Sequence, residues 1–503
     1  MPSLIDLMLA GRQVQPPSPW PQAVVDAPVW NFAAGELAQG RWSLLALWGE
    51  PSTVRMAIMD EQTAEIAIVI LDCPDHSYPS VGKHHPPALR LERAVNDLFG
   101  LEAEGSSDTR PWLDHNRWGV CFPLGDRIAA LSKASPYRFL PAEGDGIHQI
   151  AVGPVHAGII EPGHFRFTAN GETVVRLEER LGYAHKGIEG HMIGATLERA
   201  ARLAGRVSGD STVAYAFAFS RAAEAALQLV VPDRAVWLRA LVAELERLAN
   251  HLGDIGAICN DASFALMHAH CSVLRESILR AAHTTFGHRL MRDIVVPGGV
   301  TRDLDNEGRA IIRATLDNVC LRFPALVELY DNTASLQDRT VTTGVLKPAL
   351  AKQYAAGGYI GRASGRSFDA RRTLGYPPYD RLRFEVPVLN DGDVNARVWI
   401  RVREVEQSLS LIDQILDQLP EGPLQVQAVY RQEPHEGMAI VEGFRGDVLV
   451  WLRLRDDRIE RCHLRDPSWF QWPLLEAAIE GNIVADFPLC NKSFNCSYSG
   501  HDL

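Results

Sequence analysis

The amino-acid sequence predicts an α+β N-terminal domain followed by a mainly α-helical domain with small β-sheets. Short apolar segments separated by turns fill the first part of the chain, and long amphipathic runs follow. The chain has 503 residues, 46% hydrophobic and 22% charged, which is a globular composition too long for one domain of about 150 residues. We therefore expect two domains, residues 1–140 and 141–503.

The N-terminal part contains two strand candidates and one helix candidate. Residues 56–59 and 64–71 are apolar and β-rich, and the second segment (AEIAIVIL) is typical of a strand buried on both faces. Residues 87–100 place apolar side chains at helical spacing between an initial proline and a final glycine. Residues 136–146 are rich in proline and glycine, which predicts a linker.

The second part is predicted to be mainly helical. Long helical patterns cover residues 196–230, 234–259, 265–291, 306–335 and 394–419. Glycine-marked loops are expected at 296–300 and 357–365, and the alternation in residues 424–455 indicates a small sheet. Such a core predicts a site assembled from distant segments.

Charge and targeting patterns narrow the function classes. The net charge of −12 disfavours broad contact with nucleic acid or anionic lipid. The N-terminus lacks a secretory signal, and the apolar stretch 214–231 contains Arg221 and Glu224, which favours a buried helix over a membrane span. The loop GGYIGRASG matches no nucleotide-binding motif, so we expect neither an NAD nor an ATP site. These patterns predict a cytoplasmic chain that meets a membrane only through partners.

The eight cysteines form no C-x-x-C pair; they lie at 73, 121, 259, 271, 320, 462, 490 and 496. Structural zinc sites and Fe–S clusters usually draw on a close pair of thiolates, so we expect no metal bound by this chain. Because the N-terminus lacks a secretory signal, we expect the thiols to be reduced. His268 and His270, beside Met267 and Cys271, spread over more than one helix face, which favours packing over metal binding.

Motifs spread over nearly the whole chain carry a family resemblance. In the first part they are Tyr78-Pro79-Ser80, Lys83, Glu92-Arg93 and Asp97-Leu98-Phe99-Gly100. In the second part they are Gly153-Pro154-Val155-His156, His185-Lys186-Gly187-Ile188-Glu189, Glu244-Leu245-Glu246-Arg247 with His251, Pro297-Gly298-Gly299-Val300, and Arg362-Ala363-Ser364-Gly365 with Asp369 and Arg371. In this order they resemble the fused large subunit of energy-converting [NiFe]-hydrogenases of the formate hydrogenlyase type, and the 30 and 49 kDa subunits of respiratory complex I.

The resemblance implies a place for nickel, and the residues there differ from the family pattern. A [NiFe] centre takes thiolates from an early and a late C-x-x-C motif, because soft anionic sulfur suits nickel. Here the early positions carry Ser208 and Ser211, and the late pair is Cys496 and Ser499, or Ser497 and Gly500 in a register shifted by one. A protonated hydroxyl does not replace a bridging thiolate, so we expect the nickel site to be lost.

The remaining cavity is expected to bind quinone or carry protons, as the resemblance to complex I implies. His156 would serve a quinone carbonyl, with Tyr215 as a substitute for the tyrosine that complex I places opposite; the alternative is a hydrogen-bonded loop histidine. Glu189 would relay protons with a raised pKa near His185, or pair with Arg202 or Arg206. Asp210 is a second candidate acid.

The same resemblance gives two expectations for the arginines that follow. Arg362 and Arg371 would face the quinone cavity or the Fe–S cluster of a neighbouring subunit, or else bind Asp369 or Glu246 and fix the fold. Lys186 replaces the arginine of the family motif, which keeps the charge and loses bidentate geometry.

The sequence thus predicts a peripheral subunit of a membrane-bound oxidoreductase on the cytoplasmic face. Its partners would be an Fe–S small subunit and antiporter-like membrane-arm subunits. The competing hypothesis is a structural or regulatory scaffold of an ion-transport complex, and an active [NiFe]-hydrogenase is a remote third.

Overall fold

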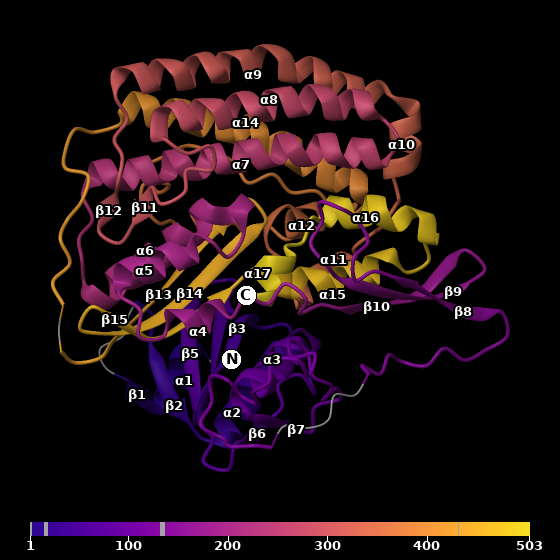
Figure 1. Ribbon diagram of the computed structural model, residues 1–503, viewed down its shortest axis with the longest axis vertical. Helices are drawn as coiled ribbons and strands as arrows, with labels where there is room; N and C mark the ends of the chain where they lie inside the picture. The colour runs from indigo at the N-terminus through magenta and orange to yellow at the C-terminus, as the bar shows by residue number, and fades with distance from the viewer. Residues whose placement is uncertain (1–2, 15–18, 131–135, 431) are drawn as a thin grey trace.

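A computed structural model describes residues 3–14, 19–130, 136–430 and 432–503 of the chain. In Figure 1 the N-terminal sheet lies at the bottom, a bundle of long helices lies at the top, and a second sheet runs between them. The predicted fold class, an α+β part followed by a mainly helical part with small sheets, is confirmed.

The N-terminal part is built on a five-stranded sheet. Its strand order is β1 (Arg12–Val14), β2 (Gln22–Val25), β5 (Glu65–Asp72), β4 (Thr53–Asp60) and β3 (Ser43–Glu50), and only the β2–β5 pair is parallel. Helices α1 (Leu4–Leu9), α2 (Ala27–Ala38) and α3 (Leu89–Phe99) pack beside it. The two predicted strands correspond to β4 and β5, and the predicted helix is α3, which is followed by Gly100 with a φ of +72°.

The two faces of this sheet belong to different cores. Alternate residues such as Met56 and Val69 pack with the N-terminal helices. Their neighbours Trp48 and Ile68 join the core of the second part, because successive strand side chains point to opposite faces. The N-terminal sheet is therefore covered on its far face by the rest of the chain.

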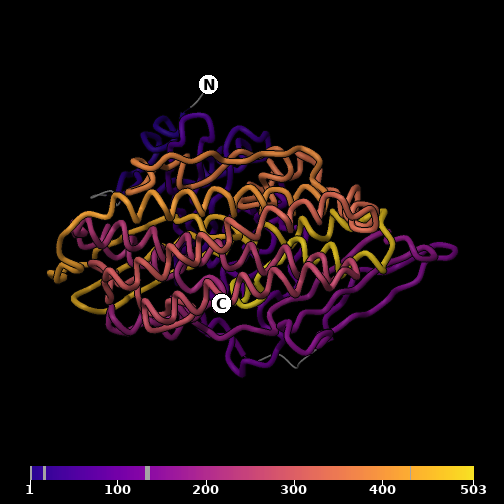
Figure 2. The backbone as a smooth tube through the Cα atoms, turned by 90° about the horizontal axis from the view of Figure 1, so that it is seen from above, coloured from indigo at the N-terminus to yellow at the C-terminus, as the bar shows by residue number. Residues whose placement is uncertain are grey.

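The second part begins with a three-stranded sheet ordered β10 (Thr173–Arg180), β9 (His164–Asn170) and β8 (Ile147–Val152). Its bundle consists of α7 (Asp233–Asp261), α8 (Ala265–Phe286), α9 (Asn306–Asn332) and α14 (Val394–Gln418), which lie side by side in Figure 2. Beneath the bundle run α6 (Thr212–Leu227) and the sheet β13 (His435–Gly443), β14 (Gly446–Arg455) and β15 (Arg458–Arg465).

A short strand pair, β6 (Ser77–Pro79) and β7 (Glu102–Glu104), completes the N-terminal part. The shorter elements of the second part are β11 (Val295–Val296) paired with β12 (Gly299–Val300), α4 (Ile188–Met192), α5 (Leu197–Ala204), α10 (Ala334–Thr340), α11 (Pro348–Gln353), α12 (Gly358–Ala363), α13 (Ala370–Thr373), α15 (Ser468–Ile479), α16 (Phe487–Phe494) and α17 (Tyr498–Asp502).

Some predicted segments differ from the structure. The helix expected over 196–230 is two helices, α5 and α6, separated by the turn that carries Ser208 and Ser211. The loop expected at 357–365 contains the short helix α12, and the glycine at its start has a φ of +61° and lies against the backbone of Arg445. The small sheet starts at His435 rather than at residue 424.

The interface between the two parts is tightly packed. Trp48 of β3 stacks on His463 of β15 with ring centroids 5.1 Å apart and lies 5.7 Å from the ring of Trp451. Arg55 of β4 donates to Glu436 of β13 at 2.8 Å. Within the described residues, no helix has the length and apolar character needed to cross a bilayer.

Candidate functional site

A cavity of about 610 Å³ brings together segments that are far apart in the sequence. It is bounded by the loop between β8 and β9, the turn before α6, the turn between β13 and β14, and the segment from α16 to α17. Its polar lining is His156, Glu161, Ser208, Asp210, Asp261, Arg445, Asn491, Lys492, Asn495, Ser497, Tyr498 and Ser499. Two of the residues predicted to act here, His156 and Asp210, therefore share one cavity.

His156 is positioned by a hairpin and faces a tyrosine. Its Nδ1 lies 3.2 Å from the carbonyl oxygen of Pro154, and its Nε2 lies 3.3 Å from the hydroxyl of Tyr498 at the start of α17. Burial raises the pKa of Tyr498, so this hydroxyl keeps its proton at neutral pH. The pair places two groups that exchange protons side by side in the cavity.

Tyr215 lies elsewhere. Helix α6 directs this fully buried side chain toward β15, where its hydroxyl donates to Asp466 Oδ2 at 2.6 Å. It does not line the cavity of His156. Tyr498 occupies the place that the sequence suggests for Tyr215.

The early motif meets the late motif through a contact of Ser208 with Ser497. Ser208 Oγ donates to Asp210 Oδ1 at 2.6 Å and lies 3.3 Å from Ser497 Oγ. This contact favours the register that pairs Ser497 and Gly500 over the one that pairs Cys496 and Ser499. Burial raises the pKa of the Cys496 thiol far above its ordinary value, which disfavours a thiolate there.

An ion pair occupies the same place. Arg445 Nη2 donates to Asp210 Oδ2 at 2.5 Å, and Arg445 Nη1 donates to Ser211 Oγ at 3.2 Å. Burial alone would raise the pKa of Asp210, but the charge and hydrogen bonds of Arg445 outweigh it and lower that pKa to about 2. Asp210 is therefore ionised at neutral pH and has no proton to donate.

The donors present do not fit a [NiFe] centre. The centre needs four thiolates, and the surrounding groups are hydroxyls, a buried thiol and the Arg445–Asp210 pair. Across the described ranges, no group of three or more His, Cys, Asp or Glu side chains is arranged to hold a metal ion.

Glu189 has partners other than those expected. Its Oε1 accepts from His463 Nδ1 at 2.9 Å and from the Leu464 backbone N–H at 3.0 Å, and Arg461 lies 3.7 Å away. Burial would raise the pKa of Glu189, but His463 and Arg461 together lower it. The pKa shift is thus opposite in sign to the predicted one.

The alternative partners of Glu189 and its expected neighbour are engaged elsewhere. Arg202 pairs with Glu198 and Arg206 pairs with Asp293. His185 Nδ1 lies 2.7 Å from the Asp502 carbonyl oxygen.

Arg362 and Arg371 lie in a buried charge network rather than in the cavity. Arg362 donates to Glu404 at 2.8 Å and to Glu442 at 2.9 Å. Arg371 donates to Asp369 at 2.7 Å and to Glu244 at 2.9 Å. Of the two predicted carboxylate partners Asp369 is present, while Glu246 is replaced by Glu244, Glu404 and Glu442.

Glu246, which the sequence suggests only as a partner of Arg362 or Arg371, is a further candidate acid. Its carboxylate accepts from the backbone N–H groups of Val213 and Ala214 at 2.7 and 3.0 Å, at the start of α6 and next to Asp210. Burial raises its pKa to about 8, against the effect of these hydrogen bonds. The sequence signal for this residue was its position in the Glu244-Leu245-Glu246-Arg247 motif, which the fold brings next to the turn that carries Ser208 and Ser211.

Motif residues of the N-terminal part are structural. Ser80 Oγ donates to Glu92 Oε2 at 2.8 Å, and the Val81 N–H donates to Glu92 Oε1 at 2.6 Å. Asp97 accepts from the backbone N–H groups of Trp112 and Leu113 at 2.7 Å. The YPS, ER and DLFG motifs therefore fix loops onto α3.

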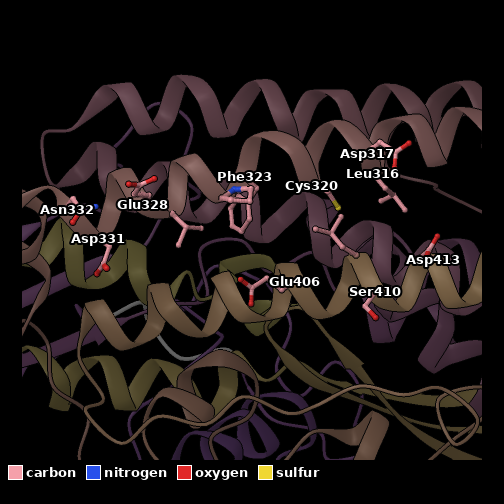
Figure 3. A pocket seen from close by; sticks show the side chains of 13 residues that line it. Leu316, Asp317, Cys320, Phe323, Glu328, Asp331, Asn332, Glu406, Ser410 and Asp413 are labelled. Carbon is pink, nitrogen blue, oxygen red and sulfur yellow. The ribbon is translucent and has the colours of Figure 1, made fainter.

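A separate groove of about 720 Å³ runs between α9 and α14. Its floor is apolar and its rim carries Asp317, Glu328, Asp331, Glu406 and Asp413, as Figure 3 shows. It lies on the outer bundle and contains none of the predicted site residues.

Comparisons with known proteins match both parts of the chain. Residues 261–435 match the family of the respiratory-chain NADH dehydrogenase 49 kDa subunit, and residues 50–131 match the family of its 30 kDa subunit. A solved structure of the membrane-bound sulfane sulfur reductase, an archaeal respiratory membrane complex, contains a chain with a TM-score of 0.67 and 26% identity, covering 71% of this chain and 99% of that one.

Curated relatives extend the match across the fused chain. Formate hydrogenlyase subunit 5 of Escherichia coli (strain K12) is 31% identical over 448 residues, covering 86% of this chain and 78% of that protein. Carbon monoxide-induced hydrogenase of Rhodospirillum rubrum is 32% identical, covering 69% and 97%. One NADH-quinone oxidoreductase subunit of Syntrophobacter fumaroxidans (strain DSM 10017 / MPOB) is 30% identical, covering 70% and 95%. The chain belongs to the family of fused complex I 30 kDa/49 kDa-like subunits that includes formate hydrogenlyase subunit 5.

Proposed function

We propose that this chain is a peripheral subunit of a membrane-bound, complex I-like oxidoreductase that handles quinone without a [NiFe] centre. The observation that carries the proposal is the contact of His156 with Tyr498, 3.3 Å apart, in a cavity where an ion pair and serines stand at the nickel-ligand positions. The proposal has three parts: the absence of nickel, the quinone reaction and the partners.

The absence of nickel is supported by the ligand chemistry. Ser208, Ser211 and Ser497 present hard oxygen atoms, and Arg445 brings a permanent positive charge next to Ser211. A divalent metal at this place would be repelled by the guanidinium and would lack soft ligands. Metal analysis of the purified complex tests this part, and nickel near one equivalent per chain would overturn it.

The quinone reaction follows from the two proton-bearing groups. A quinone becomes a quinol when it takes up two electrons and two protons. His156 Nε2 and the Tyr498 hydroxyl would each supply one proton to a quinone oxygen, while the electrons arrive from an Fe–S cluster of a neighbouring subunit. Asp210 and Arg445 would keep the inner end of the cavity polar, and Ile160 and Phe487 supply apolar walls for the ring.

Partner contact is supported by the hairpin that carries His156. Val155 and Ile159 of this loop are 80% and 96% exposed, which is unusual for large aliphatic side chains beside a site. We place the Fe–S small subunit on this loop. Antiporter-like membrane-arm subunits would lie beyond it and would hold the chain on the cytoplasmic face of the membrane.

A scaffold without redox chemistry is the second candidate, and the buried network around Arg362 favours it. The side chains of Arg362, Glu404 and Glu442 are at most 1% exposed and fill the interior below the bundle with fixed charges. In a scaffold this network would hold a shape that transmits movement between partners.

Variants of the assembled complex separate the two candidates. His156→Ala and Tyr498→Phe should each lower the rate of quinone reduction, by about 10²-fold or more for the histidine. His148→Ala, on the exposed face of β8, and Tyr430→Phe are matched controls. Unchanged quinone reduction in both site variants, with assembly intact, would favour the scaffold.

A further inference from the structure

A second cavity, of about 560 Å³, lies where the N-terminal part meets the second part. One wall is formed by β3 and α3, and the other by residues 185–191 with His463 and Trp469. Most of its lining is aliphatic or aromatic, including Leu91, Val95, Phe99 and Leu124. It shares no lining residue with the cavity of His156.

Two buried ring nitrogens on residues of this lining have no hydrogen-bond partner among the described residues. They are Nε2 of His463 and Nε1 of Trp48, on side chains whose residues are 8% and 2% exposed. The two rings are stacked with centroids 5.1 Å apart and planes 9° from parallel, so the two side chains lie at the same end of the cavity. Buried polar groups are normally paired, which makes this end incomplete as it stands.

The contacts of His463 determine which of its ring nitrogens carries a proton. Glu189 accepts from Nδ1 at 2.9 Å and is held by the Leu464 N–H and by Arg461, so its carboxylate keeps the proton of the ring on Nδ1. In the ring form whose single proton lies on Nδ1, Nε2 accepts a hydrogen bond. The indole of Trp48 is a donor only.

A hydroxyl group satisfies both requirements, because it donates one hydrogen bond and accepts others. A carbonyl or ether oxygen satisfies only Trp48. A charged group is disfavoured at this end, because Glu189 already engages His463 and the facing wall of β3 and α3 is apolar. The volume lies within the range of about 300–1,000 Å³ usual for small-molecule sites.

We propose that this interdomain cavity binds a small apolar molecule that carries a hydroxyl group, with the hydroxyl donating to His463 Nε2 and the hydrocarbon body lying against α3. The site goes beyond the quinone reaction proposed at His156. It uses different residues and requires no electron transfer, so its test does not depend on that reaction.

The test uses the purified full-length chain and two probes of nearly equal shape, 1-naphthol and 1-methoxynaphthalene. Binding is measured by equilibrium dialysis at neutral pH. The naphthol should bind about five- to tenfold more tightly, because only it donates a hydrogen bond to His463. Replacing His463 with phenylalanine should reduce naphthol affinity to that of the ether.

Filling the cavity provides a second arm that leaves the Glu189–His463 pair intact. Leu98→Trp, at a partly buried position of the lining, should weaken both probes at least tenfold. Ala38→Trp, at an exposed position of α2, is the matched control and should bind as the wild type does. Thermal unfolding confirms that each variant is folded.

Three outcomes would overturn the proposal. They are equal affinity for the two probes, naphthol affinity unchanged by Leu98→Trp, and no binding of naphthol at millimolar concentration. If His463→Phe does not fold, the probe pair and the Leu98→Trp variant still decide the question.

Discussion

Arg445 and Asp210 form an ion pair of 2.5 Å that joins the turn between β13 and β14 to the turn before α6. The Arg445 side chain is 5% exposed, whereas that of Asp210 is 34% exposed. Loss of the ion pair therefore leaves the Arg445 charge in a more buried position than the Asp210 charge. Arg445 has little access to water if it loses the carboxylate, whereas Asp210 has more.

This asymmetry predicts unequal effects of the two substitutions. Asp210→Ala should lower the free energy of unfolding by about 3 kcal/mol, because it leaves a buried guanidinium uncompensated. Arg445→Met should cost less, because water reaches the remaining carboxylate. Urea unfolding of both single variants and of the double variant checks this, and the double variant should be more stable than Asp210→Ala alone. Equal costs for the two single variants would contradict the argument.

The same pair predicts an acid dependence. The pKa of Asp210 is lowered from 3.8 to about 2, so its contribution to stability is complete above pH 3.8 and is lost as the pH falls toward 2. Stability curves of the wild type and of Asp210→Asn should therefore converge in this interval. Parallel curves would show that the ion pair does not form.

Glu246 predicts the opposite pH dependence near neutrality. Its pKa is raised from 4.5 to about 8 by burial, so the folded chain holds a proton that the unfolded chain releases. Stability contributed by this group is complete below pH 4.5 and declines as the pH rises toward 8. In Glu246→Gln this decline should be absent. Urea unfolding at pH 5.5, 7 and 8.5, together with the infrared band of a protonated carboxyl group, measures both effects.

The ion pairs of Arg55 contribute to the stability of the interface between the two parts. Arg55 donates to Glu50 at 2.9 Å and to Glu436 at 2.8 Å, and Arg453 contacts the same carboxylates. Arg55→Met should lower the free energy of unfolding by about 3 kcal/mol. This is the lower end of the range for breaking a buried ion pair, because Arg453 partly replaces the lost positive charge. Arg403→Met, from an exposed pair with Glu406, should cost under about 1 kcal/mol in the same urea titration.

Thiol labelling checks the packing of the cysteines. Cys320 is exposed on α9 and Cys121 is partly exposed, whereas the other six are buried. Burial raises the pKa of Cys259 and Cys271 to about 12, which suppresses their thiolates further. A thiol reagent should therefore label Cys320 first in the native chain. Rapid labelling of Cys496 without denaturant would contradict the burial of the late motif.

The sequence predicts the elements better than the contacts between them. Apolar periodicity is sufficient for β4, β5, α3 and the long bundle helices, because burial and periodicity coincide there. It does not show that Tyr498 rather than Tyr215 faces His156, since helix orientation is set by packing against β15. The predicted sign of the Glu189 pKa shift is wrong, because His463 and Arg461 lie far away in sequence. Long-range pairing of charges leaves no local pattern.

The shared core has a consequence for how the chain is made. The face of the N-terminal sheet that carries Trp48 and Ile68 is covered by residues that include Met438 and Trp451. During synthesis at about 5–20 residues per second, that apolar face emerges from the ribosome tens of seconds before its cover does. A nascent chain of this kind needs protection from aggregation during that interval, which makes it a natural client of holding chaperones.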